Sequence, residues 1–271
     1  MNFTTKTIVI TGASDGIGAE LARQLAPERP RLVLAARGRE ALERVAADCT
    51  ARGAQAIAVP TDVAVEDDCR RLIETAVAQY GSIDALVNNA GVSMHAEFES
   101  IEDFSTFERL WRINCLGTIA CTRFAWPHLK ASRGLVVGVS SLAGKTGVPG
   151  RTTYCASKFA QTGFLEALRI EAEPLGIAVL GVYPGVVATE IRRRGLNAQG
   201  RPAGVSGLKE RGAMPVDECA RQIVAAMHAR RRELVMTAKG KIGLWLKLIA
   251  PRLVDNMARA ALVKGGGAGN R

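Results

Sequence analysis

The chain has 271 residues, 48% of them hydrophobic, and its 36 lysines and arginines outnumber 26 acidic residues to give a net charge of +10. This length and composition suit one large globular domain and exclude a disordered or fibrous chain. The first apolar run, Ile8–Ile10, leaves no room for a signal peptide, and the apolar stretch at 242–254 is interrupted and too short to span a bilayer. We therefore expect a soluble, cytoplasmic protein.

The positive charge is concentrated in residues 191–271, which hold 17 basic and 5 acidic residues. Such an asymmetry suits an anionic partner, a membrane surface or nucleic acid. No aromatic-rich nucleic-acid motif accompanies it, so we expect no nucleic acid and favour a solvated basic face on an enzyme with an anionic cofactor. The six cysteines are scattered and no histidine stands at metal-binding spacing, which predicts free thiols in a reducing compartment and no metal.

In chain order, short β-branched runs alternate with helical patterns, as in βαβ units with a parallel sheet. Strands are predicted near 7–11, 31–35, 55–59, 84–88, 134–140, 177–183 and 233–237. Helices are predicted near 17–26, 39–52, 66–80, 103–129, 152–173 and 217–229. The pattern indicates an α/β fold with a doubly wound, parallel, seven-stranded Rossmann-type sheet.

Two segments fall outside this alternation. Residues 189–213 form a long connection that we interpret as a mobile lid of the catalytic domain, 1–238. Residues 239–271 are predicted to be a carboxyl-terminal helical extension with a frayed tail. The part at 239–264 suits three roles that the sequence leaves open: a cover for the pocket, a subunit interface, or peripheral contact with a membrane surface.

A glycine-rich turn, Thr11–Gly18, joins the first predicted strand to the first predicted helix. Glycines there permit positive φ and close approach of a ligand, while the free N–H groups of the helix face a pyrophosphate. The turn therefore predicts a dinucleotide site. Its contributing residues are Gly12, Ser14, Asp15, Gly16, Ile17 and Gly18.

The second predicted strand ends in Ala36 and Arg37, where an acidic residue would bind the ribose 2′-hydroxyl of NAD(H). A guanidinium instead suits a 2′-phosphate in charge and geometry, so we expect NADP(H). Asp62 and Val63 follow the third strand and are candidates for contact with adenine. A helix-capping role for Asp62 is the alternative.

Tyr154 and Lys158 are four residues apart in a predicted helix and share one face. An ammonium group beside a phenol lowers the phenol pKa, which would suit proton exchange with a substrate hydroxyl. Ser140 and Ser141 end the fifth strand at the edge where such sheets bind ligands. Asn114 lies inside a long predicted helix, where an amide is a poor helix former.

With these motifs the sequence resembles the short-chain dehydrogenases/reductases, in their single-domain branch. The matching pieces are TGASDGIG (11–18), NNAG (88–91), Asn114, VSS (139–141), YCASK (154–158), PG (184–185) and Thr189, in family order over roughly residues 5–237. Segments 136–150 and 239–264 are also similar to hydroxysteroid-dehydrogenase-like members, a hint of apolar substrates.

The resemblance implies an NADP(H)-dependent oxidoreductase that interconverts a carbonyl and an alcohol with a catalytic tetrad of Asn114, Ser141, Tyr154 and Lys158. It implies that Tyr154 exchanges the proton, Ser141 polarises the substrate oxygen, Lys158 tunes Tyr154 and binds the nicotinamide ribose, and Asn114 relays protons through a water. Further cofactor contacts are implied at Asn89, Ala90, Gly91, Tyr154, Lys158, Pro184, Gly185, Val187 and Thr189. A homodimer or homotetramer through the helices near 103–129 and 152–173 is also implied.

Some questions stay open at this point. Asp15 stands where many NADP-preferring relatives carry a basic residue, so mixed cofactor specificity is an alternative. Reduction of a 3-oxoacyl carrier-protein thioester is an alternative function, and a catalytically silent cofactor-binding regulator is another. The run Arg192–Arg194 suits either an anion or a solvated lid face, and the latter is favoured. His95 is expected at the surface, and Trp245 in packing.

Overall fold

The computed structural model describes residues 1–204 and 212–260. Seven parallel strands form one sheet in the order β3-β2-β1-β4-β5-β6-β7, which reverses direction between β1 and β4 as a doubly wound fold requires. The strands are β1 (Thr7–Thr11), β2 (Arg31–Ala36), β3 (Gln55–Pro60), β4 (Ala85–Asn88), β5 (Leu135–Val139), β6 (Ala178–Tyr183) and β7 (Glu233–Val235). The predicted fold class is confirmed.

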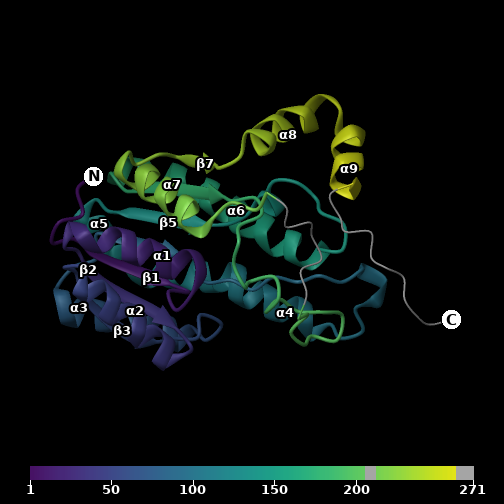
Figure 1. Ribbon diagram of the computed structural model, residues 1–271. Helices are drawn as coiled ribbons and strands as arrows, with labels where there is room; N and C mark the ends of the chain where they lie inside the picture. Colours follow the sequence, from purple (N-terminus) through teal and green to yellow (C-terminus); the bar gives the residue numbers. More distant parts are fainter. Residues whose placement is uncertain (205–211, 261–271) are drawn as a thin grey trace.

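Helices cover both faces of the sheet (Figure 1). One face packs against α1 (Gly16–Leu25), α2 (Arg39–Ala51) and α7 (Val216–His228), and the other against α3 (Glu66–Tyr80), α5 (Gly117–Ser132) and α6 (Thr152–Ala172). Alternate residues of β1 serve the two cores: Ile8 and Ile10 pack in the first and Val9 in the second. Because both faces are covered, the central strands are continuously apolar.

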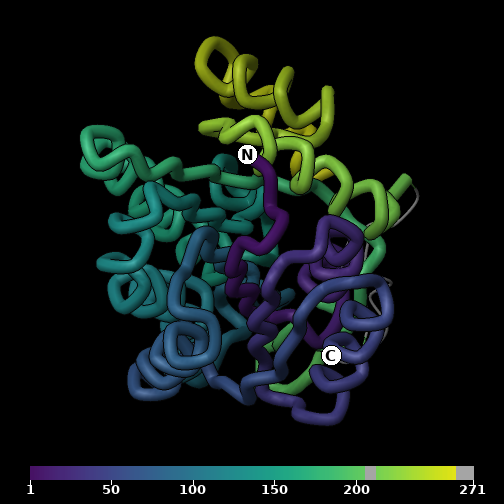
Figure 2. Tube along the Cα trace, turned by 90° about the vertical axis from the view of Figure 1, so that its left-hand side faces the viewer, coloured from purple at the N-terminus to yellow at the C-terminus, as the bar shows by residue number. Residues whose placement is uncertain are grey.

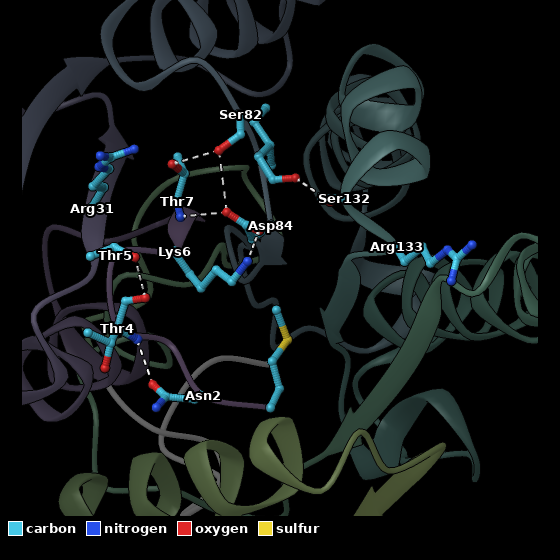
Figure 3. Close-up of polar contacts among 12 residues, drawn as sticks. Asn2, Thr4, Thr5, Lys6, Thr7, Arg31, Ser82, Asp84, Ser132 and Arg133 are labelled. Carbon is cyan, nitrogen blue, oxygen red and sulfur yellow. Dashed lines mark hydrogen bonds and ion pairs between the residues drawn. The ribbon is translucent and has the colours of Figure 1, made fainter.

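The amino-terminal edge of the sheet is held by the buried carboxylate of Asp84, just before β4 (Figure 3). It accepts hydrogen bonds from Lys6 Nζ at 2.9 Å and from the backbone N–H of Thr7 at 2.9 Å. Charged hydrogen bonds of this kind are stronger than neutral ones. They fasten β1 to β4 at the end of the sheet opposite the predicted ligand site.

The helix predicted near 103–129 is interrupted. α4 (Ser105–Trp111) and α5 are joined by a π-helical turn, η3 (Arg112–Leu116), which contains Asn114. A π-turn inserts one residue into a helix and is frequent at functional sites. The remaining short 3-10 turns are η1 (Ala26–Glu28), η2 (Phe98–Ser100), η4 (Leu142–Gly144) and η5 (Glu173–Leu175).

The carboxyl-terminal extension consists of α8 (Ala238–Ile249) and α9 (Pro251–Ala260). Both helices stand out from the body of the molecule in two perpendicular views (Figures 1 and 2). Trp245 is 75% exposed, so the packing expected of it is not found within the described part of the chain. No helix within residues 1–204 and 212–260 is long and apolar enough to cross a membrane. The predicted frayed tail lies outside the described residues.

Candidate active site

A cavity of about 1450 Å³ lies at the carboxyl edge of the sheet, where loops leave every strand. Nearly all predicted site residues line it. They are Gly12, Ser14, Asp15, Gly16, Ile17, Arg37, Asp62, Val63, Asn89, Ala90, Gly91, Ser141, Tyr154, Lys158, Pro184, Gly185, Val187 and Thr189. Gly18 and Asn114 do not line the cavity. They contact residues next to it: Gly18 packs against Gly12 and Asn89, and Asn114 forms hydrogen bonds with Val92.

The glycine turn has a backbone conformation and close backbone contacts that residues with side chains would not permit. Gly12 has a φ of +65° and Gly16 a φ of +54°, both in the left-handed region that favours glycine. A Cβ on Gly18 would lie 2.4 Å from the carbonyl oxygen of Gly12 and 2.5 Å from Asn89 Nδ2. The turn therefore needs its glycines for its own closure, and the resulting open backbone fits a dinucleotide pyrophosphate at the start of α1.

Two side chains lock this turn to the loop after β4. Asn89 Nδ2 donates to the carbonyl oxygens of Thr11 at 3.0 Å and Gly12 at 3.1 Å. The hydroxyl of Thr11 accepts from the backbone N–H groups of Asn89 at 3.0 Å and Ala90 at 3.1 Å. Thr11 was not among the predicted site residues, although it opens the TGASDGIG motif, because its role depends on a partner about 78 residues away.

Asp15, which seemed to disfavour a phosphate-rich ligand, has two partners. Its carboxylate accepts from the backbone N–H of Gly16 at 2.7 Å, as the N-cap of α1. It also pairs with Arg194 Nη1 at 2.8 Å, which brings a cation from the segment after β6 to the glycine turn. Arg37 is exposed at the cavity wall and makes no hydrogen bond or ion pair with other residues of the described part.

Asp62 shapes the loop after β3. Its Oδ1 accepts from the backbone N–H of Ala64 at 3.0 Å, and its own N–H donates to Asp68 Oδ2 at 2.9 Å. α3 begins later, after Val65, whose side chain gives no cap. Asp62 therefore closes a turn before the helix and does not cap the helix itself, so that the alternative of a helix-capping role was wrong.

Tyr154 sits in the first turn of α6 and is 7% exposed, with its ring beside the cavity. Burial raises the pKa of its phenol, and a hydrogen bond with the side chain of Ser141 acts in the opposite direction, as do the charges of Arg151 and Arg192. A raised pKa keeps the phenol protonated at neutral pH. Ser141 is held in turn by accepting from the backbone N–H of Ala143 at 3.1 Å.

Lys158 is 3% exposed and lies one turn along α6 from Tyr154. Its ammonium group donates to the carbonyl oxygen of Val139 at 3.0 Å and to Gln161 Oε1 at 3.0 Å. Burial lowers its pKa to about 7. In the described structure the ammonium group faces strand β5 and Gln161. The cations that act to lower the pKa of Tyr154 here are Arg151 and Arg192.

Asn114 is fully buried in the π-turn, and its amide makes three hydrogen bonds. It exchanges two with the backbone of Val92, at 2.8 and 3.0 Å, and donates one to Ser157 Oγ at 2.9 Å. A Cβ on Gly91 would lie 3.2 Å from Asn114 Oδ1 and 3.5 Å from Lys158 Nζ, so that glycine leaves the space between the two side chains open. Asn114 thus joins the loop after β4 to α6.

The sequence did not reveal two buried arginines of the cavity. Arg151 is 6% and Arg192 is 7% exposed, and both line the cavity beside Tyr154. The solvated role favoured for Arg192 was therefore wrong, whereas Arg193 and Arg194 are exposed. α8 and α9 also line the cavity, through residues that include Leu244 and Met257. The extension is therefore part of the pocket wall.

Smaller expectations also have outcomes. Ser140 donates to the carbonyl oxygen of Lys158 at 3.2 Å and so supports α6, as expected of a structural neighbour. His95 is half-buried and does not line the cavity. All six cysteines are free thiols, as predicted. Within the described part of the chain, no group of three or more metal-ligating side chains stands together.

Comparison with known proteins gives a consistent family. The short chain dehydrogenase family model matches residues 6–199. A Dehydrogenase/reductase SDR family protein 7-like from Dictyostelium discoideum is 32% identical over 260 residues, which cover 94% of this chain and 81% of that protein. An 11-beta-hydroxysteroid dehydrogenase-like 4A from Arabidopsis thaliana is 34% identical over 251 residues, or 92% of this chain and 82% of that protein.

Two solved structures share the fold. A short chain dehydrogenase/reductase from Burkholderia phymatum, in complex with NAD, has a TM-score of 0.81 at 23% identity and covers 93% of this chain and 96% of its own. An alcohol dehydrogenase from Thermococcus sibiricus, complexed with 5-hydroxy-NADP, has a TM-score of 0.75 at 24% identity and covers 84% of this chain and 94% of its own. With the family match, these results establish that the chain belongs to the short-chain dehydrogenase/reductase family of NAD(P)-dependent oxidoreductases and resembles its hydroxysteroid-dehydrogenase-like members.

Proposed function

We propose that this enzyme interconverts a carbonyl and a secondary alcohol, with Tyr154 as the residue that exchanges the proton. The observation that carries the proposal is that Tyr154 and Ser141 lie together in the cavity wall that also contains the glycine turn, with the Ser141 side chain acting to lower the pKa of the phenol. NADP(H), when bound, supplies or accepts the hydride. Gly12 to Gly18, Asn89 to Gly91, Lys158, and Pro184 to Thr189 would hold it.

The protein side of the reaction follows from the environment of Tyr154. Its raised pKa favours the protonated phenol, which can donate to a carbonyl oxygen during reduction. Ser141 would hold the same oxygen by a hydrogen bond and polarise it. Lys158, with its pKa lowered to about 7, gains and loses a proton near neutral pH and can replenish the site. Asn114 would order the path by which protons reach Lys158 through the space beside Gly91.

The test replaces Tyr154 with phenylalanine. We expect Tyr154→Phe to lower kcat by about a hundredfold or more, since general acid catalysis contributes on that scale, while NADPH binding stays nearly unchanged. NADPH consumption is followed with steroids, quinones, acyl thioesters and aromatic aldehydes, and NADPH binding by its fluorescence. Tyr80→Phe, which removes only a hydroxyl that donates to Gln55 outside the cavity, is the matched control. Full turnover by Tyr154→Phe would refute the mechanism.

We also propose a preference for NADP(H) over NAD(H). Arg37 follows β2 without any ion-pair partner in the described structure, and a guanidinium suits the 2′-phosphate. The negative charge of Asp15 in the glycine turn is offset by Arg194 at 2.8 Å, so the turn is less repulsive to phosphate than its sequence implied. Two arginines at this end of the cavity support the phosphorylated cofactor.

The preference is measured as the ratio of kcat/KM values for NADPH and NADH. A charged hydrogen-bonding contact contributes about 1.5–3 kcal/mol, so replacing Ala36 and Arg37 by Asp and Ala should move this ratio toward NADH by about ten- to hundredfold. Arg39→Ala is the control, because Arg39 pairs with Glu43 at 3.5 Å. A double variant that keeps its preference for NADPH would contradict the role of Arg37.

The outer face of α8 supports peripheral contact with an anionic membrane surface. Four large apolar side chains project there at helical spacing and are 65–83% exposed: Ile242, Trp245, Leu248 and Ile249. Lysines flank them on the same helix, as in helices that lie in an interface. Free thiols further suit a reducing, cytoplasmic compartment.

Membrane contact is tested by sedimentation with phosphatidylserine vesicles. The double variant Trp245→Gln, Leu248→Gln should no longer sediment with them. Wild-type protein that does not sediment with the vesicles would contradict this proposal.

Self-association is proposed through α4, η3 and α6. Each of these helices exposes a large apolar side chain: Trp111, Leu116 and Ile170 are 42–71% exposed. Light scattering after gel filtration should give the mass of a dimer or tetramer. A monomer at micromolar concentration would contradict this proposal.

A further inference from the structure

Arg151 lies immediately before α6 and carries a buried charge for which residues 1–204 and 212–260 provide no counter-ion. The residue is 6% exposed, and its guanidinium lines the active-site cavity. Within the described residues, its side chain makes one hydrogen bond, which Nη1 donates to Ser93 Oγ at 3.2 Å, and its buried Nε has no partner there. Burying a cation unpaired costs several kcal/mol, so such a group is normally matched by an anion.

The neighbours of Arg151 do not supply that anion. Within residues 1–204 and 212–260 it forms no salt bridge with a carboxylate. Burial has the largest effect on its pKa and lowers it; Tyr154 and Cys155 act to raise this pKa, and a second arginine, Arg192, acts to lower it. Arg192 is 7% exposed, lines the same cavity and donates to the carbonyl oxygen of Val187 at 3.0 Å. Two buried guanidinium groups therefore face one cavity.

The position of Arg151 ties this charge to the reacting end of the cavity. Its Cζ lies 5.7 Å from the centre of the Tyr154 ring. The glycine turn, where the cofactor phosphates fit, has Arg37 and Arg194 at its own end. Arg151 is thus placed at the substrate end, beside the ring whose hydroxyl would protonate the substrate oxygen.

Apolar side chains surround Tyr154 at this end of the cavity. Val92, Val148 and Leu196 line the cavity and belong to the same hydrophobic cluster as Tyr154. An apolar wall with a small number of placed polar groups is the usual design of a small-molecule site, in which the polar groups fix orientation. Here the fixed groups are the proton donor and a guanidinium.

We propose that the substrate is an amphipathic anion, an oxo- or hydroxycarboxylic acid with an apolar remainder, whose carboxylate is bound by Arg151 with Arg192 beside it. This inference rests on the proposed function of Tyr154 and names the substrate class that it serves. A guanidinium donates two parallel hydrogen bonds to a carboxylate, which would satisfy the unpartnered Nε and orient the carbonyl toward Tyr154 and Ser141.

Binding without turnover separates this inference from the proposed reaction. Octanoate, which has no reducible carbonyl, is titrated calorimetrically into protein containing NADP⁺, with octanol and octyl sulfate as neutral and tetrahedral-anion probes. We expect octanoate to bind more tightly than both. Arg151→Gln should weaken octanoate binding ten- to hundredfold and leave NADPH binding unchanged, whereas Arg44→Gln, an exposed arginine of α2, should leave octanoate binding unchanged.

Arg151→Lys retains the charge and should keep part of the octanoate affinity that Arg151→Gln loses. To detect a folding defect, the melting temperature of each variant is measured with and without NADPH. Equal binding of octanoate by wild type and Arg151→Gln would overturn the inference. Tighter binding of octyl sulfate than of octanoate by the wild type would also overturn it. So would an Arg151→Gln variant that loses affinity for NADPH but not for octanoate. Because octanoate is not reduced, its binding is measurable even if hydride transfer through Tyr154 fails.

A kinetic comparison distinguishes carboxylate binding by Arg151 from an effect of Arg151 on the pKa of Tyr154 alone. Oxo-octanoic acids, with the carbonyl moved stepwise along the chain, are compared with their methyl esters. A carboxylate site predicts that Arg151→Gln raises KM about tenfold or more for the best acid and changes KM for its ester less than twofold. Equal losses of kcat for acid and ester, with a displaced pH profile, would show that Arg151 only adjusts the phenol and would overturn the proposal.

Discussion

Replacing Lys158 with methionine should remove a pH dependence of folding that its buried ammonium group creates. Burial lowers the pKa of Lys158 from 10.5 to about 7 in the folded protein, and in the unfolded chain the group regains its ordinary value. Between these two values the unfolded chain holds a proton that the folded protein has released. The free energy of unfolding therefore rises with pH in this window, by about 1.4 kcal/mol per pH unit from this group alone.

From about pH 7 to about pH 9 this contribution integrates to roughly 2 kcal/mol, since the folded group is only half titrated at the lower limit. Urea unfolding of the protein without cofactor, followed by circular dichroism at both pH values, measures it. Lys158→Met should gain about 2 kcal/mol less than wild type over this interval. Lys130→Met, which removes an exposed lysine at the end of α5, should behave as wild type.

The comparison uses the change with pH and not the absolute stability, so loss of the Lys158 bonds to Val139 and Gln161 does not obscure it. Parallel changes for wild type and Lys158→Met would refute the reasoning. They would mean that the ammonium group keeps its ordinary pKa in the fold, and that Lys158 cannot exchange a proton near neutral pH in the free enzyme.

The remaining predictions concern the supports of the site. Gly18→Ala puts a Cβ 2.4 Å from a backbone oxygen, so it should destabilise the fold by about 1–3 kcal/mol and abolish NADPH binding. Gly163→Ala, in open space within α6, is the control and should raise the melting temperature. Equal melting temperatures of the two variants would contradict this prediction. Asn114→Leu removes three buried hydrogen bonds and should cost about 2–4 kcal/mol in urea unfolding, and a cost below about 1 kcal/mol would show that the π-turn needs no amide. Gly91→Ala should narrow the space between Asn114 and Lys158 and lower kcat with little change in NADPH affinity, and an unchanged kcat would remove the proton route from consideration.

The strands could be predicted because each carries a short, mostly apolar run of residues. All seven were placed within a few residues of their bounds, and so was α6, where Tyr154 and Lys158 share a face. The glycine turn could also be predicted, because its backbone conformation excludes most side chains. These features depend on chemistry that neighbouring residues carry themselves.

The features that sequence reasoning missed depend on contacts between distant segments. Arg151 resembles an ordinary surface residue before a helix until Ser93, 58 residues away, and the cavity wall enclose it. The direction of the Lys158 ammonium group is set by a carbonyl of β5 and by Gln161. The exposure of Trp245 follows from α8 standing away from the sheet, which no local periodicity of that segment distinguishes from burial.

The π-turn at 112–116 has a consequence for how this helix can vary. Each residue advances about 100° around an α-helix, so one inserted residue rotates everything beyond it by that angle. Before the turn, Leu110 packs in the cluster around Tyr154; after it, Cys121 and Leu129 pack in the core beneath the sheet. The extra residue acts as a phase shift between two packing environments. A single-residue deletion within this turn would put the two halves out of phase, and would therefore disturb the active site more than most substitutions at the same positions.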